Sequence, residues 1–390
     1  LDGLDIDKLK ARRSEKWSTY PADVLPLWVA EMDFPLAAPI RNVLRRALDL
    51  DDLGYPLDSD KTGLREAFSE RMETRFGWSP DPMRVEILAD IVQAMYVAHH
   101  AYANPGDAAV VQTPIYPPFL TSVQRSGRRV VENRLEPGPD GFRFDLEALR
   151  AESDDARLLL LCNPHNPSGR VYTRAELDGL ADLALERDWV VVADEIHADL
   201  VYQGQHIPFA SLSPEIAART VTLTSATKAF NIPGLRTSIA HFGSEELQQR
   251  FNDYVPPRVR GGMGLLGFDA TIAAWRHSQP WLDQVVPYLR ANRDFAAEWA
   301  ARHWPDVVAY VPESTYLMWL DFRGARLPTT PGPFFLRRAR LALTDGRFFG
   351  PGLEGYARLN FATSRAILTQ ALERITRALD EHRSGVASAN

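Results

Sequence analysis

Hydrophobic and polar positions along the middle of the chain follow two periods, one typical of strands and one of helices. Short apolar runs closed by turn residues predict strands at 85–90, 108–114, 157–164, 189–195 and 220–226. Apolar positions three and four residues apart predict helices at 38–50, 63–77, 91–102 and 173–188. Because runs such as "WVVVADE" are apolar throughout, we expect an α/β fold with a mostly parallel sheet buried on both faces.

The two ends of the chain follow other patterns. Residues 1–35 are interrupted by prolines and are expected to lack long elements. After about residue 275, long amphipathic helices combine with the strand-like segments "TYLMWLDF" and "YARLNFA", which indicates a second, smaller α+β domain. In the middle part, Thr173 and Glu176 have the spacing of a capping box that starts a helix.

Composition narrows the classes of protein that remain. The chain has 390 residues, of which 45% are hydrophobic, enough for a large core. Its net charge of −7 gives no electrostatic case for nucleic acid or anionic membrane, and its apolar runs are too short to span a bilayer. The single cysteine, Cys162, excludes an internal disulfide, and "LDGLDIDKLKARRSEKW" does not read as a signal peptide. We therefore expect a cytoplasmic protein that binds neither nucleic acid nor membrane.

Polar residues gather where three predicted strands end. These groups are Asn163–Gly169, Asp194–His197 and Ser225–Lys228. Ligands of open parallel sheets bind at the carboxyl ends of the strands, so the groups are expected to share a site. A carboxylate at the end of a buried run, as at Asp194, is costly unless a cation or hydrogen bonds meet it. A helix cap or a structural ion pair would also explain this residue.

The stretch "SATKAFNIPGLR" places Ser225, Lys228 and Arg236 in a segment otherwise poor in charge. Single lysines and arginines are mostly surface charges, and "CNPHNPSGR" with Asn166 is by itself only a turn. Yet a hydroxyl and a guanidinium suit a phosphate. A lysine near a fixed cation in a partly dry site has a lowered pKa and can act as nucleophile or base. Together these are the parts that bind pyridoxal 5'-phosphate (PLP).

A series of blocks extends this pattern over nearly the whole chain. They are "KWSTYPADVLPLWVAEMDFP", "GYP", "TPIYPPF", "LLCNPHNPSGRVYTRAEL", "VVADEIHADLVY", "TSATKAFNIPGLR" and "YARLNFATSR". In their order and spacing the sequence resembles the fold type I PLP-dependent enzymes of the aminotransferase class I/II superfamily. "WVAEMDF" and "DEIHADLV" favour the MalY/PatB group of cystathionine β-lyases, or C–S lyases.

The resemblance implies an architecture, the aspartate aminotransferase fold. A large PLP-binding domain would cover residues 40–275 and contain a mostly parallel, seven-stranded sheet. A smaller α+β domain would cover residues 276–390, joined by the N-terminal segment 1–39.

The resemblance also assigns contacts to the cofactor ring. Lys228 matches the lysine that bonds covalently to PLP and later carries the Cα proton of the substrate. Asp194 matches the partner of the pyridine nitrogen, and Asn166 matches the residue that donates to the phenolic oxygen. Tyr116 matches the aromatic residue that stacks on the ring. His197 stands where many aminotransferases carry a tyrosine, and it either touches the same oxygen or packs behind it.

Another group of residues matches the phosphate site. Ser225 and Arg236 match phosphate ligands of the superfamily. The backbone N–H groups of Val92 and Gln93 would add the start of a helix, where anions bind well. Many relatives have Pro-Gly before this helix, whereas this chain has an acidic residue, Asp90, which is unfavourable beside a phosphate unless it points away.

The remaining assignments concern the substrate and a second subunit. Arg358 in "YARLNFA" matches the arginine that holds the α-carboxylate of the substrate. Ala30 and Glu31 stand where the N-terminal segment would close over the substrate, with their backbone near its carboxylate. Tyr55 in "GYP" matches a tyrosine that reaches the phosphate of the neighbouring subunit, which implies a homodimer with shared sites.

These residues serve any α-amino acid, so the reaction rests on the subgroup resemblance. It favours β-elimination from L-cystathionine or a related L-cysteine S-conjugate, which yields a thiol, pyruvate and ammonia. The alternative is an aminotransferase that acts on an aromatic or other hydrophobic amino acid. A third interpretation is a role mainly as a regulatory binding partner, because some proteins of the subgroup have one besides catalysis.

Overall fold

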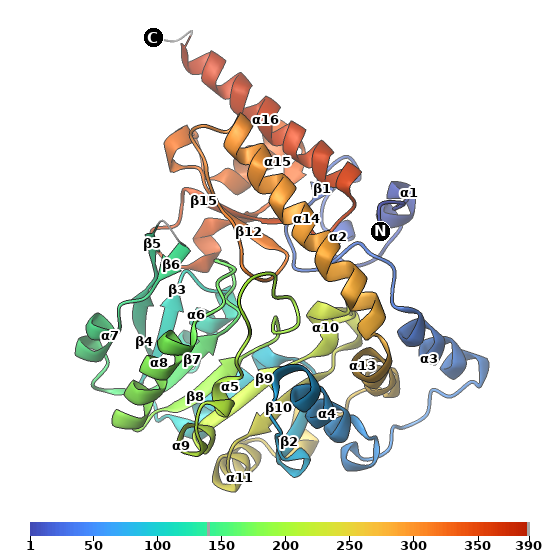
Figure 1. Cartoon of the computed structure of the whole chain (residues 1–390), viewed down its shortest axis with the longest axis vertical. Helices are drawn as coiled ribbons and strands as arrows, with labels where there is room; N and C mark the ends of the chain where they lie inside the picture. Colours follow the sequence, from blue (N-terminus) through green and yellow to red (C-terminus); the bar gives the residue numbers. More distant parts are fainter. Residues whose placement is uncertain (139–140, 388–390) are drawn as a thin grey trace.

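A seven-stranded sheet forms the centre of the larger part of the molecule (Figure 1). The structure, a computed structural model, describes residues 1–138 and 141–387. The strand order is β2-β10-β9-β8-β7-β3-β4. The strands are β2 (Val85–Leu88), β3 (Ala108–Thr113), β4 (Arg129–Arg134), β7 (Ala156–Cys162), β8 (Val190–Asp194), β9 (Thr220–Thr224) and β10 (Ser238–Phe242). β10 runs antiparallel to both of its neighbours and every other pairing in this sheet is parallel, so the expected sheet is confirmed.

Two strands of this sheet, β4 and β10, have no counterpart among the predicted strands. β4 lies at the edge of the sheet, and its exposed Arg129, Glu132 and Arg134 interrupt the apolar run. β10 carries the polar residues Ser238 and His241, both of which are buried. The apolar run that marks the central strands is therefore missing in both.

Helices cover both faces of the sheet (Figure 1). Alternate side chains of β7 pack on opposite faces of the sheet, because successive side chains of a strand point in opposite directions. Leu158 and Leu160 pack in the cluster that includes residues of α5 (Ile91–Tyr102), α6 (Pro117–Arg125) and α11 (Glu245–Tyr254). Leu159 and Leu161 pack in the cluster that includes residues of α7 (Leu146–Glu152) and α8 (Arg174–Glu186).

The helices predicted in this part are present, and two of them show the expected end signals. The Thr173 hydroxyl accepts from the backbone N–H of Glu176, whose carboxylate accepts from the backbone N–H of Thr173, so the capping box at α8 is confirmed. α4 (Leu64–Phe76) ends at Gly77, whose φ of 68° lies in the left-handed region that glycine adopts without strain. α3 (Ala38–Asp49) packs against α13 (Leu265–His277).

A smaller part of the molecule contains an antiparallel sheet and long helices. The sheet has the order β11 (Val308–Tyr310), β12 (Leu317–Asp321), β15 (Tyr356–Asn360), β14 (Thr344–Asp345). The helices are α14 (Gln279–His303), α15 (Pro331–Ala339) and α16 (Arg365–Ala387). Among the described residues, no helix combines the length and apolar character needed to cross a bilayer.

The N-terminal segment lies against this smaller part. Its short elements are α1 (Ile6–Lys10), α2 (Glu15–Ser18) and β1 (Leu25–Pro26), and β1 pairs in parallel with β13 (Leu341–Ala342).

The division of the chain into domains at residues 39 and 275 stays a prediction, and residue 275 falls inside α13. The remaining elements are β5 (Glu136–Gly138), β6 (Gly141–Arg143), α9 (Pro214–Ala217), α10 (Ala226–Ala229), α12 (Pro257–Arg260) and 3-10 turns η1 (Ser59–Lys61), η2 (Pro82–Arg84), η3 (Phe209–Ser211), η4 (Pro233–Leu235), η5 (Arg323–Ala325) and η6 (Gly346–Phe349).

Candidate active site

The carboxyl ends of β7, β8 and β9 border a cavity of about 270 Å³. Asp194 ends β8, Asn166 lies in the turn after β7, and Lys228 lies in α10 directly after β9. The residues predicted for the site that line this cavity are Ala30, Val92, Tyr116, Asn166, Asp194, His197, Lys228, Arg236 and Arg358. The structure thus brings together residues that are far apart in the sequence, while their roles remain predictions.

Asp194 is a buried carboxylate without a cationic partner. It is 4% exposed, and its Oδ1 accepts from the backbone N–H of Ile196 at 3.0 Å. Within residues 1–138 and 141–387, no lysine, arginine or histidine forms an ion pair with it. Burial raises its pKa to about 7, although the hydrogen bond from Ile196 and the charge of Lys228 act in the opposite direction. A further cationic group in the cavity would therefore restore the charged form of Asp194.

The Lys228 amine projects into the same cavity. Its Nζ donates to the backbone oxygen of Ala30 at 3.1 Å. Burial and the nearby Arg358 guanidinium lower its pKa to about 8, although Asp194 acts in the opposite direction. A fraction of this amine is therefore neutral at physiological pH, as a nucleophile or base requires.

Arg358 reaches the cavity from β15 and, within residues 1–138 and 141–387, also lacks an oppositely charged partner. Its guanidinium donates to Asn166 Oδ1 at 2.9 Å and to the Trp28 backbone oxygen at 3.0 Å. It lies 5.1 Å from the centre of the Phe349 ring, and its Nε has no partner in the described part of the chain. Burial lowers its pKa to about 10. A carboxylate from a ligand would supply the missing negative charge.

Asp90, the acidic residue before α5, points at a cation. Its carboxylate accepts from the Gln93 backbone N–H at 2.8 Å, which caps α5, and it forms an ion pair with Arg236. Val92 lines the cavity, whereas Gln93 does not, and the Gln93 N–H is already engaged. Asp90 itself lines the cavity, so its carboxylate offsets the positive charge that Arg236 and the helix start bring to this end.

Ser225 does not line the cavity, but its neighbour Thr227 does. The Ser225 hydroxyl donates to the Thr237 backbone oxygen at 2.7 Å and accepts from the Thr227 backbone N–H at 3.1 Å, which caps α10. The sequence reasoning missed Thr227, although a hydroxyl directly before Lys228 was a visible signal. It also missed Cys162, which ends β7 beside Asp194 and lines the cavity.

Two ring side chains line the cavity. Tyr116 precedes α6, and its backbone N–H donates to the Asn166 backbone oxygen at 3.1 Å. His197 is buried, which lowers its pKa to about 3, so its imidazole is neutral. Its Nδ1 has no partner among the described residues. His197 therefore faces the site, and its contact with a ligand stays a prediction.

Besides Gln93 and Ser225, two further predicted residues lie outside the cavity lining, Glu31 and Tyr55. The Glu31 carboxylate accepts from the Ser14 hydroxyl at 2.7 Å, although the neighbouring Ala30 lines the cavity. Tyr55 is fully exposed on the molecular surface. Its predicted role concerns the site of a second subunit and stays a prediction.

The donor set of the cavity fits PLP. Lys228 supplies an amine for its carbonyl group, and Asp194 supplies the carboxylate that a cationic ring nitrogen needs. Arg236 and the start of α5 would supply positive charge for its phosphate once the Asp90 carboxylate no longer engages them.

Comparison with known proteins identifies the family. The chain belongs to the aminotransferase class I and II family, whose model matches residues 23–375. It is 36% identical to a cystathionine beta-lyase of Corynebacterium glutamicum over 96% of this chain and 99% of that protein. It is 35% identical to the cystathionine beta-lyase PatB of Bacillus subtilis, over 96% and 100%. It also resembles the structure of the PLP-bound C–S lyase from Staphylococcus hominis, with 28% identity, a TM-score of 0.90 and coverage of 96% and 99%.

The family assignment and the aspartate aminotransferase-type fold expected from the sequence are thereby confirmed. The full-length similarity to proteins named as cystathionine beta-lyases also agrees with the subgroup that the sequence motifs favoured.

Proposed function

We propose that this protein is a PLP-dependent C–S β-lyase that acts on L-cystathionine or a related L-cysteine S-conjugate. The reaction consumes water and yields a thiol, pyruvate and ammonia. One observation carries the proposal: a lysine amine, a buried carboxylate without a cation and a buried guanidinium without an anion line one cavity. The names of the full-length relatives direct the choice of reaction within the family.

The chain supplies groups that hold and orient an amino acid. Arg358 binds the α-carboxylate through its guanidinium, which Asn166 and the Trp28 carbonyl already hold in place. PLP, when bound, draws electrons away from the Cα–H bond and so makes this hydrogen acidic. The Lys228 amine is the base that takes this proton, because its lowered pKa leaves part of it neutral. As an ammonium group, it can then protonate the departing sulfur.

Other residues hold the cofactor in place. Asp194 would accept the N–H of the pyridine ring and so keep the ring cationic. Arg236 and Thr227, with the backbone at Val92, would hold the phosphate at the start of α5. Tyr116 would pack against the ring, and Ser225 supports this end of the site by capping α10.

We also propose a homodimer in which Tyr55 reaches the phosphate of the neighbouring site. Its support is an exposed apolar stretch around Tyr55, in which four leucines are each at least 59% exposed: Leu48, Leu50, Leu53 and Leu57. A second copy of the chain would cover this surface. We place the protein in the cytoplasm, and the buried, unpaired Cys162 supports a reducing compartment.

The test is incubation of the PLP-loaded protein with L-cystathionine and no keto-acid acceptor, with pyruvate and free thiol followed together. Equal and sustained release of both over many turnovers is the expected result. A single conversion of the cofactor to its pyridoxamine form, without thiol, would instead identify an aminotransferase. Release of neither product, with cystathionine and with a panel of other cysteine thioethers, would refute the proposal.

A further inference from the structure

Residues 28–33 form a strap along the cavity, and its backbone oxygens accept hydrogen bonds from the proposed catalytic groups. The Trp28 oxygen accepts from Arg358 at 3.0 Å. The Ala30 oxygen accepts from Lys228 at 3.1 Å and from the Tyr316 hydroxyl at 3.0 Å. The group that binds the α-carboxylate and the group that moves the Cα proton are therefore held by two carbonyls only two residues apart.

The strap is also fastened to both parts of the molecule. The side chain of Asn360 in β15 donates to the backbone oxygens of Val29 and Glu31, both at 2.7 Å. On the other side, Asn231, three residues after Lys228, accepts from the Met32 N–H and donates to the Met32 oxygen, both at 2.9 Å. The strap thus spans from the small sheet to the segment that carries Lys228.

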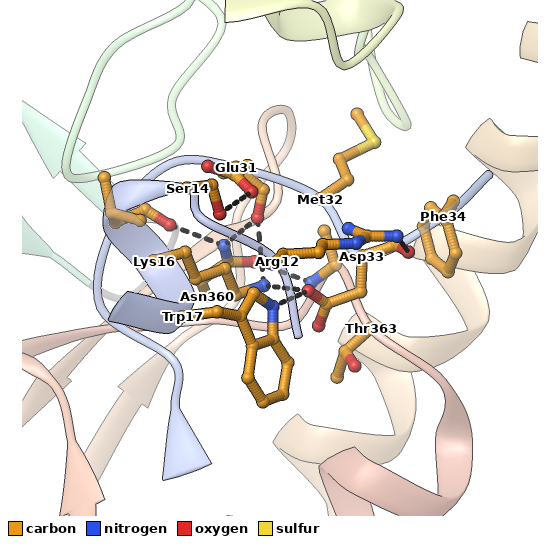
Figure 2. Close-up of polar contacts among 12 residues, drawn as sticks. Arg12, Ser14, Lys16, Trp17, Glu31, Met32, Asp33, Phe34, Asn360 and Thr363 are labelled. Carbon is orange, nitrogen blue, oxygen red and sulfur yellow. Dashed lines mark hydrogen bonds and ion pairs between the residues drawn. The ribbon is translucent and has the colours of Figure 1, made fainter. Parts of the chain in front are cut away.

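At the end of the strap, Asp33 is held by a buried ion pair (Figure 2). Lys16 Nζ lies 3.0 Å from Asp33 Oδ1, and each side chain is 1% exposed. Figure 2 shows that Trp17 also points at Asp33, and its Nε1 donates to the same carboxylate oxygen at 2.8 Å. Lys16 additionally donates to the Glu31 oxygen at 3.0 Å. The ion pair thereby ties α2 to two residues of the strap.

The energetics of a buried ion pair indicate that it fixes the positions of the groups it joins and contributes little to the stability of the fold. Removing two charges from water costs roughly what their attraction returns, so a buried pair adds little net stability over apolar residues of the same size. What it does provide is a defined geometry, because the ammonium must meet both Asp33 Oδ1 and the Glu31 oxygen. The chain contains five lysines, at 8, 10, 16, 61 and 228, and two of them, Lys16 and Lys228, donate to backbone oxygens of the strap.

We propose that the buried Lys16–Asp33 ion pair positions the active site: it fixes the strap, whose Trp28 and Ala30 carbonyls set the spacing between Arg358 and Lys228. Neither Lys16 nor Asp33 lines the cavity, so both act through the backbone of the strap. The proposal rests on the proposed roles of Arg358 and Lys228. Misplacement of reacting groups by about 1 Å costs ~100-fold in rate, so a displaced strap should impair catalysis without unfolding the protein.

The double variant Lys16→Met/Asp33→Asn tests this. It removes both charges together, so that neither is left buried alone, and it keeps an oxygen that accepts from Trp17. The matched control is Asp23→Asn/Arg340→Met, which removes an exposed ion pair between the same N-terminal segment and the small domain. Unfolding temperature and circular dichroism establish that both variants fold.

Two readouts follow, one of them independent of substrate. Limited acylation of the cofactor-free protein over a range of pH, with mass spectrometry of the five lysine sites, gives the pH midpoint of Lys228. Around this amine lie Arg358, Asp194, Glu31 and Glu15, and burial is the main cause of its low pKa. A loosened strap admits water, so we expect the Lys228 midpoint to rise by about one unit or more in the double variant and to stay unchanged in the control. We also expect kcat to fall ~100-fold in the double variant alone.

A wild-type Lys228 midpoint together with a wild-type kcat in the folded double variant would overturn the proposal. Because the acylation readout needs no substrate, it still decides the matter if no thioether is cleaved. If the double variant does not fold, Tyr316→Phe replaces it, since it removes one of the two donors to the Ala30 oxygen without stranding a charge. We then expect a raised Lys228 midpoint and a kcat lowered about tenfold, and unchanged values for both would refute the role of the strap.

Discussion

Replacing Arg358 by methionine removes the guanidinium assigned to the α-carboxylate and keeps a long apolar side chain. The substrate then loses two charge-assisted hydrogen bonds, each worth about 1.5–3 kcal/mol. The loss of roughly 3–6 kcal/mol corresponds to a decrease of about 10²–10⁴ in kcat/KM, since each 1.4 kcal/mol is tenfold. Because the guanidinium binds the carboxylate in the ground state and in the transition state alike, we expect most of the decrease to appear as a higher KM rather than a lower kcat.

The same substitution should leave the fold intact. Arg358 is buried without a paired carboxylate, so its removal relieves an uncompensated charge. Against this gain, Asn166 Oδ1, the Trp28 oxygen and the Thr344 hydroxyl each lose a donor, at a cost of about 1 kcal/mol apiece. We therefore expect an unfolding temperature within ~3 °C of the wild type.

The assay couples pyruvate release to lactate dehydrogenase and compares substrate with a ligand that has no carboxylate. S-Methylcysteamine, as a competitive inhibitor, should bind wild type and Arg358→Met within about threefold, because it makes no use of the guanidinium. Arg323→Met, which removes an exposed arginine from the same domain, is the control and should keep kcat/KM within about twofold. A kcat/KM of Arg358→Met within about fivefold of the wild type, or an equal loss of affinity for S-methylcysteamine, would refute the assignment.

Other predictions address the remaining groups. Lys228→Ala should abolish the visible absorbance of lysine-bound cofactor, and a persisting chromophore that borohydride reduces would contradict the role of Lys228. In the cofactor-free protein, the Asp194 pKa is raised from 3.8 unfolded to about 7 folded, so its contribution to stability is present below pH 3.8 and lost as the pH rises to about 7. Asp194→Asn should accordingly stabilise the cofactor-free protein more at pH 7.5 than at pH 4.5 in thermal unfolding, and a pH-independent difference would refute this. Tyr55→Phe should weaken cofactor binding about tenfold through loss of one hydrogen bond, and mixing it with Lys228→Ala should restore activity in hybrid dimers; absence of rescue would argue against a shared site.

The sequence predicted the part of the site that lies at strand ends. Asp194, Asn166 and Lys228 follow buried parallel strands, and such strands carry their last residues to a common edge. Arg358 lies in the other sheet, and only the resemblance to a known family connected it with these residues. Chain physics alone gives no rule that places residue 358 beside residue 166, because the contact depends on how the two parts pack.

Local contacts in the structure determine details that the sequence motifs could not give, such as which hydroxyl lines the cavity and what the Asp90 carboxylate contacts. Both Ser225 and Thr227 carry hydroxyls, and the turn of α10 determines that Thr227 lines the cavity while Ser225 caps the helix. Asp90 looked unfavourable for a phosphate site unless it pointed away, and the structure shows instead that it lines the cavity, with its carboxylate engaged by Arg236 and by the start of α5. The Lys16–Asp33 pair had no signal in the sequence, since an ion pair between a short helix and a later irregular segment follows no periodicity.

Buried charges of two kinds lie in or beside this site: a charge pair at the end of the strap, and charges in the cavity that have no partner of opposite sign. The contrast between them supports the proposed function. At the end of the strap, Lys16 and Asp33 are equally buried and satisfy each other within the chain. Arg358 of β15, which donates to the strap at the Trp28 oxygen, has only neutral acceptors among the described residues, and the one hydrogen bond that the Asp194 carboxylate accepts from them comes from a backbone N–H. Equally buried charges are therefore paired within the chain where they hold the strap in place. Leaving Arg358 and Asp194 unpaired costs stability in the empty protein, and that cost is offset when ligands bring a carboxylate and a cationic ring.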